Sequence, residues 1–191
     1  DSQYDETAGV LVLTVDPQRQ LLVTDSRFDL QAAAEAPAFE VRRIEENIFK
    51  ALAGILAELQ TRCVAFEDRR MSCHAFHQLT GELSDKTPGV ELKALGDRLD
   101  SMRACKDDEE IDLTRRALAI AEAAFRKTIS GIAAGMTEKQ IAWQLEVNMR
   151  EAGADEPAFP IIVASGPNSA MPHAIPGERV CRVGDPLLFD W

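Results

Sequence analysis

The chain has 191 residues, of which 46% are hydrophobic, and a formal net charge of −11. This length suits one large domain or two small ones, and the composition is that of a folded chain rather than a disordered one. The acidic excess repels phosphate backbones and no basic run offsets it, which excludes nucleic acid as an expected partner.

The first predicted element is a β-hairpin. Residues 10–15 and 21–24 are short apolar runs, and residues 16–20 supply a turn between them. We interpret both strands as buried on both faces, because both runs are almost wholly apolar. Apolar residues then recur every three or four positions from Ile44 to Leu59. This spacing predicts a helix with one buried stripe.

The next segment alternates strand and helix signals. Residues 62–66 form an apolar run, and Ser72 is placed to cap a helix that ends near Leu83. Residues 90–105 have the pattern of a strand, a short helix and a crossover. Such alternation predicts an α/β domain, which we place at residues 1–104.

A long helix opens the second predicted domain, at residues 105–191. The acidic run 107–110 lies in its first turn, where it suits the positive end of the helix dipole. Thr137 and Gln140 have the spacing of a capping box for another helix, and Gly153 is placed to end that helix. The buried face of the long helix is predicted to contain Ile111, Leu118, Ala121, Phe125 and Ile129.

Cysteine usage and hydropathy indicate the compartment. The four cysteines (Cys63, Cys73, Cys105 and Cys181) lie too far apart for a secreted disulfide scaffold. Reduced thiols and a cytoplasmic location are therefore expected. No apolar run approaches the roughly 20 residues that span a bilayer, so no membrane partner is expected. The chain begins with Asp1 rather than Met, which indicates a processed, cut or incomplete N-terminus.

Asp190 is the first candidate site residue. It ends a second apolar strand signal at residues 186–189. A carboxylate at the end of a buried strand is costly unless it is paired or binds a cation, so Asp190 is a candidate metal ligand. The alternative is a strand-terminal Asp that caps the following turn. The residues by themselves favour neither interpretation.

His173 is the second candidate. It lies in a polar loop that follows an apolar strand signal at residues 160–163. An imidazole can donate or accept a proton near neutral pH, which suits catalysis. A lone histidine is more often a structural or surface residue. The nearby Ser165, Gly166, Asn168 and Ser169 are candidate hydrogen-bond donors, or simply residues that form a turn.

The third candidate is a cluster that contains two types of zinc-binding residue, namely Cys73, His74 and His77. The two histidines are three residues apart and would share one helix face. A structural zinc site needs four convergent ligands at a suitable spacing, and this cluster does not supply them. We therefore expect a solvated helix face that binds no metal.

Several segments resemble the aminopeptidase P, prolidase and creatinase superfamily. Residues 163–174 (VASGPNSAMPHA) resemble its substrate loop, and residues 187–191 (LLFDW) resemble the strand that carries its first metal-binding Asp. Trp191 departs from the Phe that usually follows this Asp. Further likeness lies in the helix pair (135–142 and 145–153) and in the N-terminal domain (5–13 and 24–32).

The resemblance implies both a fold and an activity. It implies an N-terminal α/β domain followed by the first half of a pita-bread catalytic domain, with sequence missing at both ends. The complete enzyme would be a homodimeric metallopeptidase that cleaves before a proline at the second position of a peptide. Two divalent ions (Mn²⁺, Co²⁺ or Zn²⁺) would activate water. By the same resemblance Asp190 would be one of five ligands and His173 the substrate-binding and catalytic histidine.

Two alternatives remain open. Creatinase-type amidinohydrolases share the fold and a similar His loop but need no metal. A non-catalytic binding protein with the same fold is the other alternative. Because four of the five implied metal ligands would lie beyond Trp191, the chain as given is expected to be inactive and to hold no tightly bound metal.

Overall fold

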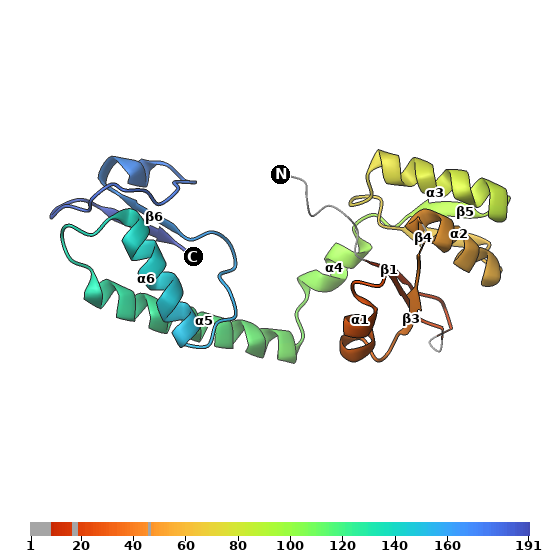
Figure 1. Cartoon of the computed structure of the whole chain (residues 1–191), viewed down its shortest axis with the longest axis horizontal. Coiled ribbons are helices and arrows are strands. Elements are labelled where there is room, and N and C mark those ends of the chain that lie inside the picture. Colours follow the sequence, from red (N-terminus) through yellow and green to blue (C-terminus); the bar gives the residue numbers. More distant parts are fainter. Residues whose placement is uncertain (1–8, 17–18, 46) are drawn as a thin grey trace. The chain divides into compact units, whose positions relative to one another are not determined.

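The computed structural model describes residues 9–16, 19–45 and 47–191. Contacts divide the chain into two compact units, Asp1–Ala104 and Cys105–Trp191 (Figure 1). Each unit has a hydrophobic core of its own. All four cysteines are free thiols. Within the described ranges, no helix is long and apolar enough to cross a membrane.

The first unit alternates strands and helices. Its elements are β1 (Gly9–Val12), β2 (Leu21–Thr24), α1 (Asp29–Glu35), β3 (Glu40–Arg43), α2 (Ile48–Glu58), β4 (Cys63–Phe66), α3 (Cys73–Lys86), β5 (Glu91–Ala94) and α4 (Arg98–Ala104). β1 pairs antiparallel with β2, and β2 pairs parallel with β3. β4 and β5 form a second, parallel pair. Helical crossovers between parallel strands are the mark of α/β architecture, so the predicted class is confirmed.

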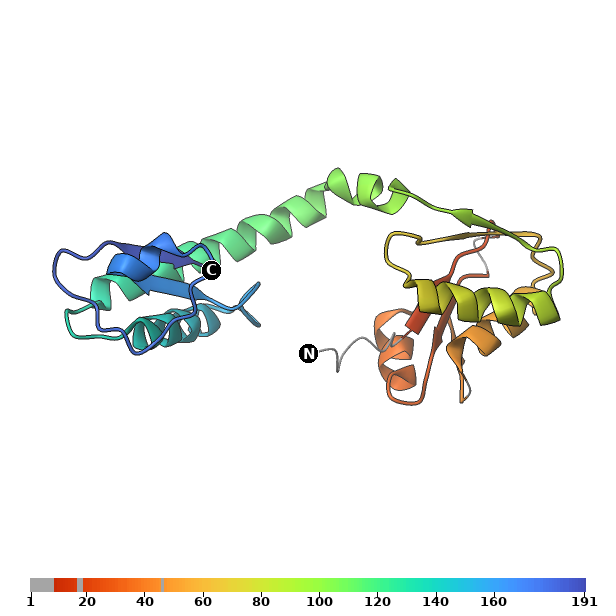
Figure 2. The same cartoon turned by 90° about the horizontal axis from the view of Figure 1, so that it is seen from above.

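One core unites the helices and strands of this unit. Helices α2 and α3 lie side by side (Figure 2). Each helix buries one stripe in the same core as β2. For α2 this confirms the predicted buried stripe, although the helix begins at Ile48 and Ile44 lies outside it. The buried members are Leu21, Val23, Leu52, Ala53, Ile55, Leu56, Leu79 and Leu83. The Ser72 hydroxyl accepts a hydrogen bond from the Ala75 amide, which confirms the predicted cap of α3.

The first strand is shorter and more exposed than its sequence predicts. β1 ends at Val12, and Leu13 and Val15 beyond it are 64% and 107% exposed. Leu11 within the strand is 53% exposed. The prediction of burial on both faces is therefore wrong for β1. The physical reason is that, among the described strands, β1 lies at the edge of the sheet with β2 as its neighbour.

The second unit packs two helices against a strand pair. It comprises α5 (Asp108–Gly131), α6 (Glu138–Glu151), β6 (Ile162–Ser165), the 3₁₀ turn η1 (Gly166–Ala170) and β7 (Leu187–Asp190). β6 and β7 are antiparallel. The core joins both helices to β6 through Ala124, Ile141, Leu145, Met149, Ile161, Val163 and Cys181.

Capping boxes start both helices of this unit. Asp107 and Glu110 form one at α5, and Thr137 and Gln140 form the predicted one at α6. In each box the first side chain accepts from the backbone of the second residue, whose own side chain accepts in return. These boxes fix where each helix begins.

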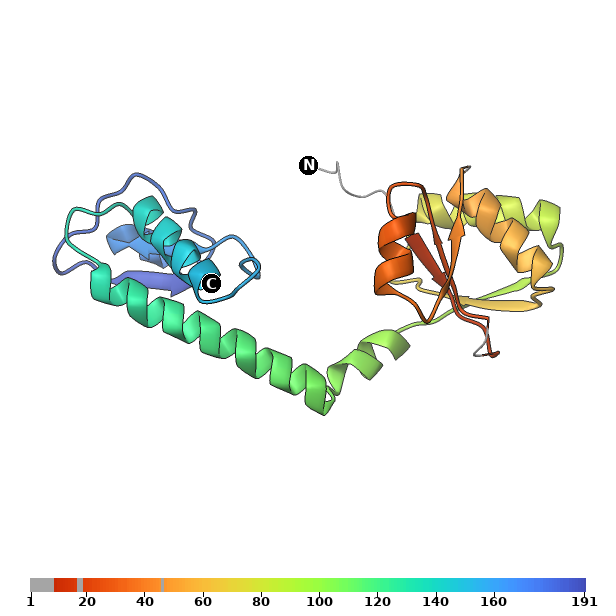
Figure 3. The same cartoon turned by 60° about the horizontal axis from the view of Figure 1, so that its bottom comes forward.

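The predicted buried face of α5 is wrong in part. Leu118 and Ile129 are 57% and 45% exposed, and the fully buried positions are instead Ala124 and Thr128. Figure 3 shows that the first turns of α5 extend past the shorter α6 and the β6–β7 pair. No other element of its unit covers that part of α5.

Candidate functional site

The candidate site is the loop that joins β6 to β7. In the strand ladder Ser165 is opposite Leu187, and Ile162 is opposite Asp190. The connecting residues 166–186 therefore leave and return at the Ser165 end of the ladder. Asp190 lies at the other end, three residue steps or about 10 Å along the strand from Leu187.

The two candidate residues belong to different segments of this unit. His173 is an exposed residue of the loop, and Asp190 is an exposed residue at the end of β7. No hydrogen bond or ion pair between described residues engages either side chain. The structure therefore leaves the imidazole and the carboxylate free to meet a ligand, and no hydrogen bond or ion pair between described residues joins one to the other.

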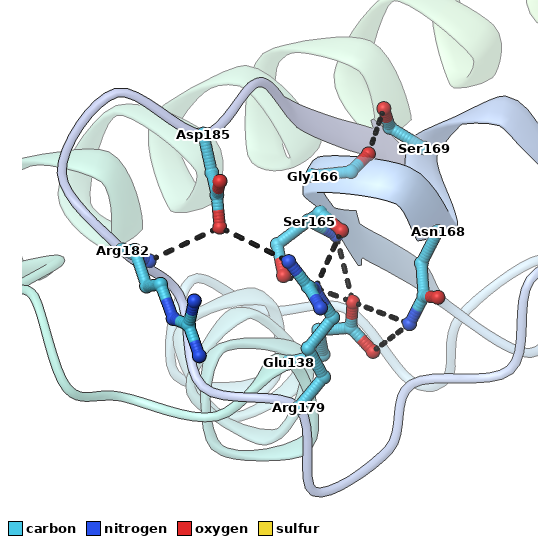
Figure 4. A network of polar contacts seen from close by, with 8 residues as sticks. All are labelled: Glu138, Ser165, Gly166, Asn168, Ser169, Arg179, Arg182 and Asp185. Atoms are coloured by element: carbon cyan, nitrogen blue, oxygen red, sulfur yellow. Dashed lines mark hydrogen bonds and ion pairs between the residues drawn. The ribbon is translucent and has the colours of Figure 1, made fainter.

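A buried carboxylate, Glu138, lies beneath the loop. It is the first residue of α6 and is 1% exposed. Its Oε1 accepts hydrogen bonds from the Ser165 amide at 2.7 Å, the Ser165 hydroxyl at 3.0 Å and Asn168 Nδ2 at 3.0 Å. Its Oε2 accepts from Asn168 Nδ2 at 3.2 Å and from the Gly177 amide at 3.3 Å. Figure 4 shows the carboxylate pointing toward Ser165 and Asn168.

This environment favours the ionised form of Glu138. Burial by itself raises the pKa of the carboxyl group, but the hydrogen bonds from Ser165, Asn168 and Gly177 outweigh burial and hold the pKa below its ordinary value. The position at the N-terminus of α6 also suits a negative charge. Neutral donors therefore compensate this buried charge, and no described cation forms an ion pair with it.

The returning part of the loop completes the first turn of α6. The amide of Glu138 donates to the Arg179 carbonyl at 3.0 Å, and that of Lys139 donates to the Gly177 carbonyl at 3.1 Å. These are amides that a helix leaves without partners inside the helix. The loop is thus attached to α6 through the backbone as well as through the Glu138 side chain.

Arg179 forms a second clasp on the start of the loop. Its Nε donates to the Ser165 carbonyl at 3.0 Å, and its Nη2 lies 3.4 Å from Asp185 Oδ2. An added Cβ at Gly166 would lie 2.5 Å from Arg179 Nη2, so the guanidinium would have to shift. Gly166 also has a φ of +51°, a region that favours glycine. The backbone conformation therefore favours glycine here, and a larger residue would also displace the Arg179 guanidinium.

The polar residues near His173 are used within the loop. Ser165 and Asn168 donate to Glu138, and the Ser169 hydroxyl donates to the Gly166 carbonyl at 2.7 Å. Of the two interpretations open for these residues, the structure favours a role in shaping the loop. We did not predict Glu138 from the sequence, where it was visible only as a residue inside a capping box.

Family comparisons identify both units. The creatinase/prolidase N-terminal domain matches residues 2–105, which is more than half of the chain. Metallopeptidase family M24 matches residues 112–191. The chain belongs to the creatinase and prolidase family. The resemblance predicted from the loop and strand motifs is thereby confirmed.

Relatives of known structure share the family fold. An X-Pro aminopeptidase from Thermotoga maritima is 35% identical, with a TM-score of 0.82 over 95% of this chain and 50% of its own. An Xaa-Pro dipeptidase from Bacillus anthracis is 30% identical, with a TM-score of 0.84 over 99% of this chain and 51% of its own. These likenesses confirm the predicted pita-bread fold, with an N-terminal domain and part of a catalytic domain.

Curated relatives in the family are longer than this chain. An Xaa-Pro dipeptidase from Pyrococcus horikoshii is 28% identical over 184 residues, which are 96% of this chain and 49% of the relative. An uncharacterized peptidase from Bacillus subtilis, also 28% identical, is covered to 52%. The chain spans about half the length of the curated relatives it matches.

Asp190, the metal ligand expected from the resemblance, lies at an exposed and well-packed strand end. Its neighbours Phe189 and Trp191 both pack on Phe125, at 5.2 and 4.5 Å between ring centroids, and these contacts hold the end of β7 in place. An exposed carboxylate on a fixed strand end suits an oxygen-preferring divalent ion. Among the described residues, however, no group of three or more His, Cys, Asp and Glu side chains is arranged to hold a metal. A metal bound at Asp190 would therefore need further ligands.

The Cys73, His74 and His77 cluster lies in the first unit, at the start of α3. All three residues are exposed. We expect a Cys73→Ala, His77→Ala double variant to contain the same amount of zinc as the parent and to melt at the same temperature with and without chelator. Elemental analysis and thermal melts test this prediction. Stoichiometric zinc that the double variant loses would contradict it.

Proposed function

We propose that this chain is the first half of a metal-dependent peptidase that hydrolyses Xaa-Pro bonds. Residues 1–104 would form the N-terminal domain, and residues 105–191 the first part of the catalytic domain. The observation that carries the proposal is the succession of both family domains in one chain. The named activities of the Thermotoga maritima and Bacillus anthracis relatives support the choice of substrate.

The exposed imidazole of His173 would act on the scissile amide. A bond that precedes proline has no N–H, so the peptidase must work through the carbonyl and the proline nitrogen. In this proposal His173 donates a hydrogen bond to the carbonyl oxygen as charge develops there, or passes a proton to the leaving nitrogen. The loop clasped by Glu138 and Arg179 supports this role, because it holds the segment on both sides of His173.

Asp190 would bind the metal in this enzyme. Two divalent ions supply Lewis-acid activation of water and of the substrate carbonyl. Mn²⁺, Co²⁺ and Zn²⁺ are the proposed ions, and the remaining ligands would come from further sequence of the full-length protein. The free thiols support a reducing, cytoplasmic setting for it.

An activity assay on the full-length protein tests the proposal. It should hydrolyse an Xaa-Pro dipeptide or an Xaa-Pro-Xaa tripeptide, and the preferred length distinguishes a dipeptidase from an aminopeptidase. A matched Xaa-Ala peptide is the control for proline dependence. Hydrolysis of creatine without added metal would indicate the amidinohydrolase alternative instead. Failure with all of these substrates at saturating metal would indicate a binding protein.

We expect Asp190→Ala to empty the metal site of the full-length protein. Loss of one carboxylate from a shared site weakens the binding of both ions. The amount of bound metal should therefore fall from two per chain to less than one. Inductively coupled plasma mass spectrometry on dialysed protein measures the change. Asp155→Ala, which removes an exposed carboxylate after α6, is the control and should retain the metal of the parent. Equal metal content in the two variants would refute the role of Asp190.

A further inference from the structure

The exposed candidate His173 depends on a buried residue that lies far from it in the sequence. His173 has no described hydrogen bond of its own, and it lies in a loop outside any helix or strand. A catalytic imidazole must be held close to its productive position, because displacement by about 1 Å can cost two orders of magnitude in rate. The groups that fix its loop are therefore candidates for a functional role.

Glu138 holds this loop on both sides of His173. Its carboxylate accepts from Asn168 Nδ2, five residues before His173, and from the Gly177 amide, four residues after it. One buried side chain thus joins the two ends of the segment 168–177. The same carboxylate also accepts from Ser165, the last residue of β6.

A chain of hydrogen bonds leads from Glu138 to the neighbours of His173. The Asn168 side chain donates to Glu138, and the Asn168 carbonyl accepts from the Met171 amide at 3.0 Å. The Met171 carbonyl in turn accepts from the Ala174 amide at 3.2 Å. Ala174 is 5% exposed, so the residue directly after His173 is fixed by packing.

Each group that contacts the Glu138 carboxylate donates to it, and the backbone amides of Ser165 at Oε1 and Gly177 at Oε2 can only donate. An ionised carboxylate accepts from each of them, whereas an amide or a protonated acid would place a donor against another donor. The observed arrangement of donors around Glu138 therefore requires its carboxylate to be ionised. We propose that Glu138 is the positioning residue of His173, and that its ionised carboxylate holds the loop in the geometry that catalysis requires. This inference rests on the proposed peptidase function.

The test uses Glu138→Gln and Glu138→Asp in the full-length protein. Glu138→Gln keeps the shape of the side chain but puts an NH₂ group against donors, so kcat should fall by roughly 10- to 100-fold. The Michaelis constant and the metal content should stay close to those of the parent. Glu138→Asp keeps the charge on a shorter side chain and should recover part of the lost kcat.

Two controls separate positioning from simple loss of stability. Glu178→Gln makes the same chemical change in the same loop, at a side chain that is 79% exposed, and should leave kcat within twofold. Ile141→Val weakens the core at a position that is 0% exposed on the same helix. It should lower the melting temperature without lowering kcat at temperatures where the protein is folded.

Amide hydrogen exchange without substrate provides a readout that does not depend on activity. Glu138→Gln should speed exchange within residues 168–177, whereas Glu178→Gln and Ile141→Val should not. If the parent shows no Xaa-Pro activity, the proposed function fails while exchange still tests whether Glu138 holds the loop. Unchanged exchange, or faster exchange with an unchanged kcat, would overturn the positioning role. Should Glu138→Gln fail to fold, Asn168→Ala removes one contact of the same carboxylate and is expected to give the same two results.

Discussion

Replacing His173 with alanine in the full-length protein is expected to lower kcat by roughly 100-fold or more. The expected loss is large because the imidazole would act mainly in the transition state, where charge develops on the carbonyl oxygen and the leaving nitrogen. The metal content should stay normal, because this proposal assigns His173 to the substrate and not to the metal. Steady-state kinetics and elemental analysis on the same preparation measure both effects.

Comparison with Asp190→Ala distinguishes a substrate-binding role from a metal-binding role. Both variants should lose activity, but only Asp190→Ala should lose metal. Ser169→Ala is a loop control, since its hydroxyl donates only to the Gly166 carbonyl, and it should retain most of kcat. If His173→Ala emptied the metal site while Asp190→Ala left it filled, the two assigned roles would be reversed.

Features that depend on neighbouring residues could be predicted from the sequence. The caps at Ser72 and Thr137 join groups three residues apart, so their signals are complete within one turn of chain. The buried stripe of α2 likewise follows from the helical period. The loop and strand motifs around His173 and Asp190 were recognisable for a different reason, namely their resemblance to a family that the comparisons confirm.

Elements without a hydrophobic period escaped prediction. α1 has seven residues and no side-chain cap, and β3 has the sequence Glu-Val-Arg-Arg, which lacks the usual alternation of a half-buried strand. β3 nevertheless forms because β2 offers a parallel partner along its whole length. Tertiary pairing therefore decides the structure of this segment, and a local pattern does not contain that information.

The role of Glu138 in the candidate site could not be predicted either, because its contacts are distant in the sequence. Glu138 contacts residues 27, 30 and 39 positions further along the chain, at Ser165, Asn168 and Gly177. In the sequence it is an acidic residue at the start of a helix. Such residues are common there because their negative charge interacts favourably with the helix dipole. Only the packing of α6 beneath β6 shows that this acid is buried and that its charge organises the loop.

Glu138 should also make the stability of the chain depend on acid. Glu138→Ala leaves several buried donors without an acceptor and should lower the free energy of unfolding at pH 7 by about 3 kcal/mol or more. Glu138→Gln, which retains one acceptor oxygen, should cost about 1–3 kcal/mol. Glu178→Gln on the exposed side of the loop should change it by no more than about 0.5 kcal/mol. Urea unfolding of the 191-residue chain measures all three.

The pH dependence follows from the direction of the pKa shift. Hydrogen bonds lower the pKa of Glu138 in the folded state despite its burial, so the stabilisation by its ionised form is fully present above the unfolded pKa of about 4.3. It is lost as the pH falls through the lower folded pKa. The difference in unfolding free energy between the parent and Glu138→Gln should therefore be constant from pH 7 to about pH 5 and shrink below about pH 4. Glutamine does not titrate, so it serves as the internal reference for the other carboxylates. A difference as large at pH 3 as at pH 7 would show that the charge of Glu138 does not stabilise the fold. The packing and shape of the side chain, and not its ionised form, would then hold the loop.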